Sequence, residues 1–320
     1  MPSAAMKKIV ILSFFALAIL AFACKKNTPI PKEDWEAVAL NGKKLYPPKE
    51  SAASLRTKDS LLAIAQANFD ADSNNLENII WLGRRTAYQS RYKDAIEIFS
   101  RGIRKFPESP ELYRHRGHRY ISVRNFDSAI QDLQKAAALA KGRPSEIEPD
   151  GIPNQLNLPL SSLQFNIYYH LGLAYYLKGE FQTALTYYDT CMQWSVNPDL
   201  LTATADWTYM ALRRTGQEEQ AKLILEKITP DLEVIENDAY LQRLLMYKGL
   251  IAPKSLLDLG NTDELVRLNV VTQGYGVGNW YLCNGDTARA RNIFSKILET
   301  EQWAAFGYIA AEADLYRFSR

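Results

Sequence analysis

The sequence is poor in cysteine and histidine, with three of each in 320 residues, and it has no excess of either charge. Three cysteines cannot form the disulfide framework on which small secreted folds depend. The 38 lysines and arginines nearly balance the 36 aspartates and glutamates, and Lys7 and Lys8 both lie in the first 23 residues. The remainder is therefore close to neutral, which disfavours nucleic-acid binding because that binding needs a basic surface.

Motifs that carry catalysis or hold cofactors are also missing. There is no H-E-x-x-H zinc site, no G-x-S-x-G nucleophile turn and no G-K-[ST] after the glycines at 274, 276 and 278. His115 and His118 lie three residues apart and share a helix face, but no third metal ligand follows at a motif spacing. We interpret both as groove-side or surface histidines, and we expect no catalytic residues, no metal and no cofactor. An enzyme built on a helical scaffold is the least favoured alternative.

The first 24 residues have the layout of a secretory leader. Lys7 and Lys8 precede an apolar run from Ile9 to Ala23, and Cys24 follows directly. A run of this length is short for a membrane-spanning helix and is typical of a signal peptide over residues 1–23. The pattern resembles bacterial lipoprotein signals, which implies lipidation of Cys24. A plain signal peptide with an incidental cysteine is the alternative.

The next residues, 24–50, combine prolines at 29, 31, 47 and 48 with lysines and glutamates. This composition favours extended chain, so we expect a flexible tether that joins the lipid to the folded body. In the lipoproteins that this leader resembles, Lys25 in place of Asp implies sorting to the outer membrane. The expected location is therefore the outer membrane of the cell envelope, with a lipid anchor.

A glycine, an alanine and a large apolar residue recur 34 residues apart, as Gly83, Ala95 and Phe99 and then as Gly117, Ala129 and Leu133. The small residues suit the point where two helices cross closely, and the large ones fill the space around them. This pattern resembles the tetratricopeptide repeat (TPR), a helix-turn-helix unit. The resemblance implies an all-α, right-handed α-solenoid of about six TPR-like hairpins over residues 51–320, with capping helices at its ends.

Further repeats follow with different clarity. The third is centred on Gly172 and Ala184 and the last on Gly278 and Ala290, whereas the fourth has Tyr209 in the usual glycine position. The fifth, over 237–249 and 253–260, is degenerate. Residues 54–69 and 303–318 are the expected caps. The insertion 142–162, between the second and third repeats, contains prolines that exclude one continuous helix. It is either an inert surface loop or a segment folded across the groove edge.

In proteins of the TPR family, the first helices of successive repeats line a concave groove that binds peptides or partner segments. Transferred to this sequence, the resemblance implies a partner-binding groove formed by seven residues: Arg84, Tyr88, Arg114, His118, Tyr169, Tyr176 and Arg213. Arginines and tyrosines suit a partner with carboxylates and planar groups. Residues 79–125 hold eleven lysines and arginines against four acids, but only Arg84 and Arg114 of the eleven face the groove by register.

These features favour a non-catalytic protein–protein interaction scaffold, a membrane-tethered TPR lipoprotein of the bacterial envelope. Its expected partner is a protein or peptide, and the membrane contact is through the N-terminal lipid. The alternative is a glycan or nutrient capture lipoprotein of an outer-membrane uptake system. Exposed aromatic residues on the convex side or beneath the insertion would favour that alternative.

Overall fold

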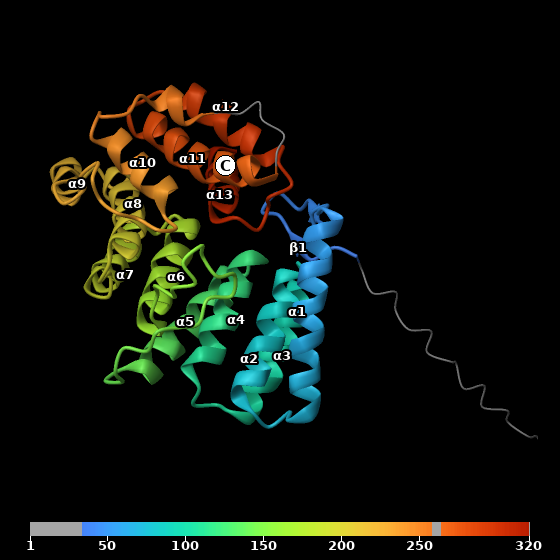
Figure 1. The fold of residues 1–320 in the computed structure, drawn as a ribbon. Coiled ribbons are helices and arrows are strands. Elements are labelled where there is room, and N and C mark those ends of the chain that lie inside the picture. Colours follow the sequence, from blue (N-terminus) through green and yellow to red (C-terminus); the bar gives the residue numbers. More distant parts are fainter. Residues whose placement is uncertain (1–33, 258–263, 320) are drawn as a thin grey trace, which may run out of the picture. The chain divides into compact units, whose positions relative to one another are not determined.

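The computed structural model describes residues 34–257 and 264–319, with side chains described up to 257 and from 271 onward. The predicted signal peptide, Cys24 and the first part of the tether lie outside the described residues. From Asp34 onward the chain forms a single contact unit. Figure 1 follows its helices in chain order from α1 to α13.

The expected fold class is confirmed, because the described chain is built almost entirely from helices that pair with their sequence neighbours. The helices are α1 (Ala52–Ala71), α2 (Leu76–Tyr88), α3 (Tyr92–Lys105), α4 (Pro110–Ser122), α5 (Phe126–Ala140), α6 (Leu163–Lys178), α7 (Phe181–Gln193), α8 (Pro198–Arg214), α9 (Glu218–Leu225), α10 (Asp238–Tyr247), α11 (Glu264–Cys283), α12 (Thr287–Leu298) and α13 (Phe306–Phe318). The predicted cap at 54–69 is α1, and the cap at 303–318 is α13.

The repeating glycines lie where the two helices of a hairpin cross. A Cβ atom on Gly83 would come within 2.4 Å of the Phe99 ring, and one on Gly172 within 2.5 Å of the Tyr188 ring. Each aromatic ring therefore occupies the space that a side chain on the partner helix would need. The α2–α3 and α6–α7 hairpins consequently require glycine at these two positions.

The fourth and fifth repeats depart from this geometry in different ways. Tyr209 replaces the glycine on α8, and its ring is buried against Tyr247 of α10 at 4.2 Å between centroids. The fifth repeat has only α10 as a regular helix. It is followed by the single 3₁₀ turn η1 (Pro253–Leu256) instead of the predicted second helix, and residues 258–260 lie outside the described residues.

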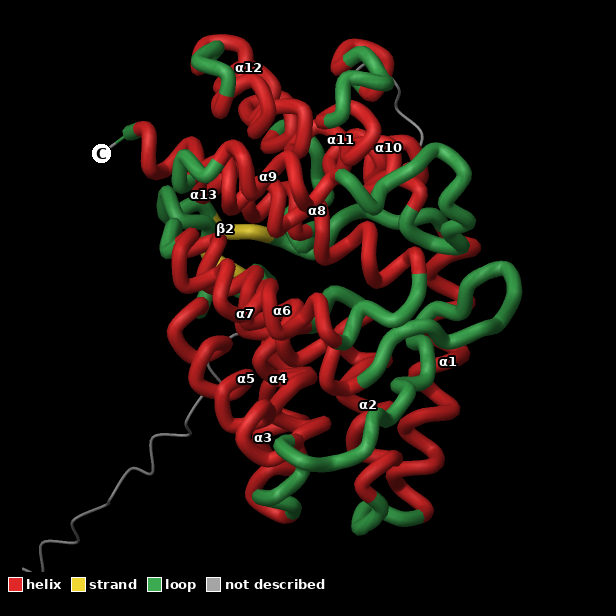
Figure 2. The backbone as a smooth tube through the Cα atoms, turned by 90° about the vertical axis from the view of Figure 1, so that its left-hand side faces the viewer, coloured by secondary structure: helices red, strands yellow, loops and turns green. Residues whose placement is uncertain are grey.

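The expectation of a flexible tether up to residue 50 is wrong for residues 34–50. Strands β1 (Ala37–Val38) and β2 (Lys44–Leu45) form a small antiparallel hairpin, and Ala37 and Leu45 are buried. The indole nitrogen of Trp303 donates to the carbonyl of Tyr46 at 2.6 Å. Figure 2 shows the strands in yellow close to α13. The burial of Ala37 and Leu45 and the hydrogen bond from Trp303 to Tyr46 hold this segment on the helical body. Its composition alone would favour an extended chain.

The C-terminal helix α13 connects to parts of the chain far away in sequence. Glu312 accepts hydrogen bonds from the backbone nitrogen of Leu40 at 2.8 Å and from Arg124, in the α4–α5 turn, at 2.8 Å. Two residues later, Asp314 accepts from both terminal nitrogens of Arg214 on α8, at 2.8 and 3.0 Å. The last helix is therefore held against the middle of the repeat array by buried charges.

We expect Glu312→Gln to destabilise the protein by about 3–5 kcal/mol, because the change leaves the buried Arg124 guanidinium without its counter-charge. Both side chains of this pair are at most 4 % exposed, so water cannot replace the lost carboxylate. Urea denaturation measures the loss. Hydrogen exchange should show the amides of α13 losing protection before those of α4.

The matched control is Glu97→Gln. Glu97 pairs with Arg104 at 3.4 Å, and its side chain is 62 % exposed, so its removal should change stability by less than about 1 kcal/mol. Equal losses in the two variants would contradict the role given to Glu312.

Candidate functional site

The first helices of the hairpins, α2, α4, α6 and α8, lie side by side and form what we call the wall. Ser109 caps α4 by accepting from the backbone nitrogen of Leu112 at 3.5 Å, and Pro110 occupies its first turn. The position at which α4 begins determines which of its side chains point toward the neighbouring helices. Arg114 and His118, four residues apart, consequently lie on one face, with His115 and Arg119 beside them.

The insertion between α5 and α6 lies across the wall. Arg84 donates to the carbonyl of Pro149 at 2.7 Å, Arg85 donates to that of Gly151 at 2.8 Å, and Arg114 forms an ion pair with Glu148 at 2.9 Å. Of the two readings that the sequence allowed for residues 142–162, the structure has the segment folded over the groove. Arg84 and Arg114, which were expected to meet a partner, are therefore already paired with a carbonyl and a carboxylate of the chain itself.

The insertion is held in place from the α6 side as well. The backbone nitrogen of Glu148 donates to the carbonyl of Ser161 at 2.9 Å, and Ile147 pairs with Ser162 in an isolated β-bridge. Asn166 on α6 donates to the Glu148 carboxylate. These contacts hold the short stretch from Ile147 to Gly151 over α2 and α4.

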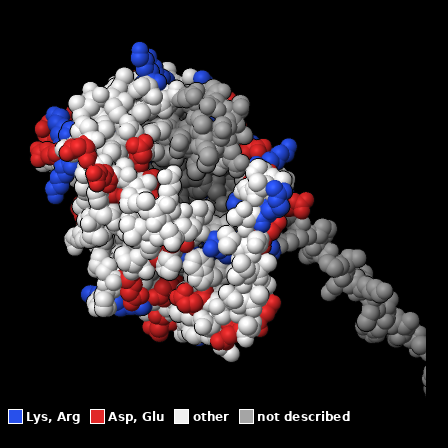
Figure 3. Space-filling model, viewed as in Figure 1, with Lys and Arg blue, Asp and Glu red and all other residues white. Residues whose placement is uncertain are grey.

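A cavity of about 200 Å³ remains between the wall and the insertion. It is lined from α2, α4 and the insertion by Arg84, Tyr88, Arg114, His118, Arg119 and Glu148. Figure 3 views one face of the protein, on which acidic and basic side chains are interspersed. The cavity differs from this surface because three of the six residues named are arginines.

The three histidines are buried or partly buried near this cavity. The rings of His118 and His170 lie 4.3 Å apart, and Nδ1 of His170 is hydrogen-bonded to the carbonyl of Asn166 at 2.5 Å. Burial, and then the positive charge of Arg114, lower the pKa of His170 to about 3. Burial also lowers the pKa of His115 and His118 well below the usual value, with nearby arginines adding to the effect. All three imidazoles are consequently neutral at pH 7.

No group of three or more histidine, cysteine, aspartate or glutamate side chains that could hold a metal ion occurs within the described ranges. His115 lies between Glu148, at 3.6 Å from its Nε2, and Arg114, whose guanidinium is 2.8 Å from its Nδ1. Cys191 is a free, buried thiol, and Cys283 is free and only partly buried. The described side chains thus provide neutral histidines and arginines for hydrogen bonding to a ligand.

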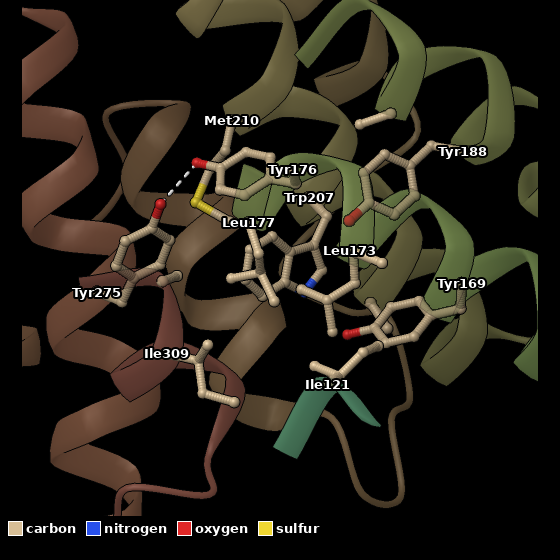
Figure 4. Close-up of a cluster of buried hydrophobic side chains, with 14 of the residues drawn as sticks. Ile121, Tyr169, Leu173, Tyr176, Leu177, Tyr188, Trp207, Met210, Tyr275 and Ile309 are labelled. Atoms are coloured by element: carbon tan, nitrogen blue, oxygen red, sulfur yellow. Dashed lines mark hydrogen bonds between the residues drawn. The ribbon is translucent and has the colours of Figure 1, made fainter. Parts of the chain in front are cut away.

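The remaining predicted groove residues have partners within the chain. The hydroxyl of Tyr169 is 3.1 Å from that of Tyr240, and Arg213 donates to the hydroxyl of Tyr209 at 2.9 Å. Tyr176 is completely buried, and its hydroxyl is 2.8 Å from that of Tyr275. Figure 4 shows the Tyr176 ring beside Trp207 and Met210, with its hydroxyl pointing to Tyr275. An open position for Tyr176 is therefore excluded in this structure.

Two residues near the cavity were missed by the sequence reasoning. Arg119 lines the cavity although it lies one residue beyond the predicted groove position at His118. Glu148 is in an insertion that the repeat pattern does not describe. The only available sequence signal was the local excess of basic residues over 79–125, which predicts a need for nearby carboxylates without locating them.

We expect the free energy of unfolding to fall as the pH is lowered from 6.5. Because the pKa of His170 is about 3 in the folded protein and about 6.5 in the unfolded chain, protons bind the unfolded chain first. The contribution of His170 to the free energy of unfolding is complete above pH 6.5 and decreases by about 1.4 kcal/mol per pH unit toward pH 3. Urea denaturation at a series of pH values measures the slope.

His170→Asn should make that slope shallower between pH 5 and 6.5. Glu219→Gln is the control, because this carboxylate is 79 % exposed and pairs only with Lys222 among the described residues. An unchanged slope in the histidine variant would contradict the buried neutral state of His170.

Comparison with known proteins identifies one segment. Residues 165–195 match the family model for the tetratricopeptide repeat, and this range covers most of α6 and all of α7. No curated protein matches the chain.

Several solved structures are similar at low sequence identity. The MamA protein is 20 % identical, with 62 % of this chain and 89 % of that chain covered and a TM-score of 0.41. YrrB, described as a TPR protein with an unusual peptide-binding site, is 13 % identical, with coverages of 74 % and 92 % and a TM-score of 0.41. Naa15/Naa10 bound to HypK-THB is 14 % identical, with coverages of 77 % and 35 % and a TM-score of 0.36. The third hairpin of this all-helical chain is thus similar to a tetratricopeptide repeat.

Proposed function

We propose that this protein is a non-catalytic scaffold that docks a protein or peptide partner on the outer side of the insertion. The TPR match in the third hairpin supports a role in binding, since helical-repeat proteins expose long surfaces to partners. The insertion immediately precedes that hairpin and lies over the wall. The partner surface proposed here therefore consists of the insertion and the helix ends that hold it.

The observation that carries this proposal is the exposure of apolar side chains on the insertion. Ile147, Ile152, Leu156 and Leu158 are between 49 % and 73 % exposed. They are four of the twelve large hydrophobic residues exposed within the described part of the chain, and they fall within twelve consecutive positions. Apolar side chains gathered in this way are typical of interaction surfaces.

Docking on the wall itself would require a larger rearrangement. A partner that reached Arg84 or Arg114 would have to displace the Pro149 carbonyl or the Glu148 carboxylate. Replacing these arginines would loosen the insertion as well as remove a contact. The outer side of the insertion can be engaged with all of these bonds intact, so we favour it over the predicted groove.

The glycan or nutrient capture alternative gains no specific support. Sugar capture would be favoured by exposed aromatic side chains. Among the twelve exposed large hydrophobic residues of the described chain, Tyr46 is the one aromatic. We therefore propose protein docking alone.

We further propose that lipid on Cys24 tethers the scaffold to the bacterial envelope, at the outer membrane. Within the described residues, no helix has both the length and the apolar character needed to cross a bilayer. The support for the anchor is the leader itself, in which an apolar run and a small residue precede the cysteine.

We expect the triple change of Ile152, Leu156 and Leu158 to Ser to weaken partner binding at least tenfold, because exposed apolar anchors lose their contact area. A photocrosslinker at position 156 in the native envelope first captures the partner. The affinity of the purified pair is then measured by calorimetry.

The matched control replaces Leu223 and Leu250 by Ser, since these side chains are 60 % and 59 % exposed elsewhere. An equal loss of affinity in the two variants, or crosslinking at position 223 to the same partner, would exclude the insertion as the docking surface.

Replacement of Cys24 by Ser should release the protein from membranes into the soluble fraction, because the acyl chains of a lipid anchor supply the membrane affinity. Fractionation after carbonate washing measures this, with Cys283→Ser as the control. Retention of the Cys24 variant on washed membranes would contradict the lipid anchor.

A further inference from the structure

Arg119 on α4 has an unusual environment for a partly buried arginine. Its guanidinium has no hydrogen-bond acceptor and no carboxylate partner among the described residues, and it lies 5.5 Å from the centre of the Tyr92 ring. Arg84 and Arg114, on the same wall, each have an oxygen partner within 3 Å. The partly buried Arg119 therefore has N–H donors that can bind an added acceptor.

Arg119 lies where two cavities adjoin. Together with Ala87 and Tyr88 it lines both the cavity beneath the insertion and a second cavity of about 210 Å³ that extends toward Trp303. The guanidinium is thus reachable from a space that holds more than a water molecule. A 150 Å³ apolar cavity is enough to hold benzene, so about 200 Å³ suits a molecule of roughly ten non-hydrogen atoms.

The charges around the first cavity are unbalanced. Arg84, Arg114 and Arg119 face Glu148, which is already paired with Arg114, and Asp150, whose Oδ2 has no hydrogen-bond partner among the described residues. Burial lowers the pKa of Arg119, and Arg114 and Arg84 lower it further. Burial, then Glu236, raise the pKa of Asp150. Three arginines outnumber the two carboxylates around this cavity, and Arg119 is the one of the three without an oxygen partner, so an added negative charge is favoured beside it.

We propose that this cavity binds a small oxyanion, the carboxylate or phosphate group of a small molecule, with Arg119 as its main ligand. The guanidinium presents two parallel N–H donors that match either group. Neutral His118, on the same helix, also lines the cavity, whereas His115 is already in contact with Arg114, at 2.8 Å from its Nδ1, and lies 3.6 Å from Glu148. This site is additional to the proposed partner docking, which uses the outer side of the insertion.

The surroundings favour a small molecule over an acidic chain. The insertion already covers the wall through the carbonyls of Pro149 and Gly151, and Tyr88 packs directly against Gly151. An extended acidic peptide would need that space. A compact anion can reach Arg119 while these contacts persist.

The test is calorimetric titration of the purified full chain in detergent with two probes, inorganic phosphate and succinate, at low ionic strength to limit screening. We expect at least one probe to bind with a Kd below 10 mM, and Arg119→Gln to weaken that binding at least tenfold. The probe that binds more tightly identifies which oxyanion is preferred. Arg104→Gln is the matched control, because Arg104 is 65 % exposed on α3.

A second measurement keeps the test decisive if Arg119→Gln fails to fold. In the wild-type chain, the imidazole resonances of His115 and His118 should shift on titration with the binding probe. The proposal would be overturned if neither probe bound, or if the Arg119→Gln variant bound the probe as tightly as the wild-type chain. It would also be overturned if saturation with the probe left the imidazole resonances of both histidines unshifted. If the insertion variants lose partner docking but still bind the probe, the oxyanion site is independent of the docking surface.

Discussion

The buried carboxylate of Glu312 is the interaction on which the arrangement of this protein depends. It joins three segments that are far apart in sequence: the N-terminal β-hairpin through Leu40, the α4–α5 turn through Arg124, and α13, on which it lies. A charge at this depth is tolerated only when several donors satisfy it. The neighbouring ion pair of Asp314 with Arg214 extends the same connection to α8. An array in which each unit would otherwise contact only its neighbours is closed by these bonds.

Because these bonds close the array, its concave side is not an open groove. Side chains that would line an open groove in a simple repeat array instead form the interior, as the buried pair of Tyr176 and Tyr275 illustrates. The insertion completes the cover by using Glu148 and two backbone carbonyls as acceptors for the arginines of the wall. The apolar outer side of the insertion stays exposed, and Arg119 lines the cavity beneath it. The proposed docking and oxyanion sites use these two features separately.

The contacts that were predicted correctly lie within single hairpins. Gly83 with Phe99 and Gly172 with Tyr188 could be paired from spacing, because two antiparallel helices joined by a short turn must cross at a fixed separation. The second helix of the fifth repeat was mispredicted because only helical spacing supported it, without the small residue at the crossing. For the site, register placed Arg84 and Arg114 near the cavity, yet it assigned Tyr176 to an open surface. The helical spacing of residues predicts which face of α6 turns inward, but it does not predict which other helices pack on that face.

By itself, the sequence determined an all-helical chain of hairpins, their order and the positions that must stay small, because these follow from helical periodicity and from the space available at each crossing. It also carries the apolar run that precedes Cys24, on which the proposed anchor depends. Only the tertiary structure decided that residues 34–50 fold onto the body, that the insertion covers the wall, and that Arg119 lacks the acceptor its neighbours have. These outcomes depend on contacts across 65 to 272 positions, where no local pattern constrains which charges and backbone groups meet.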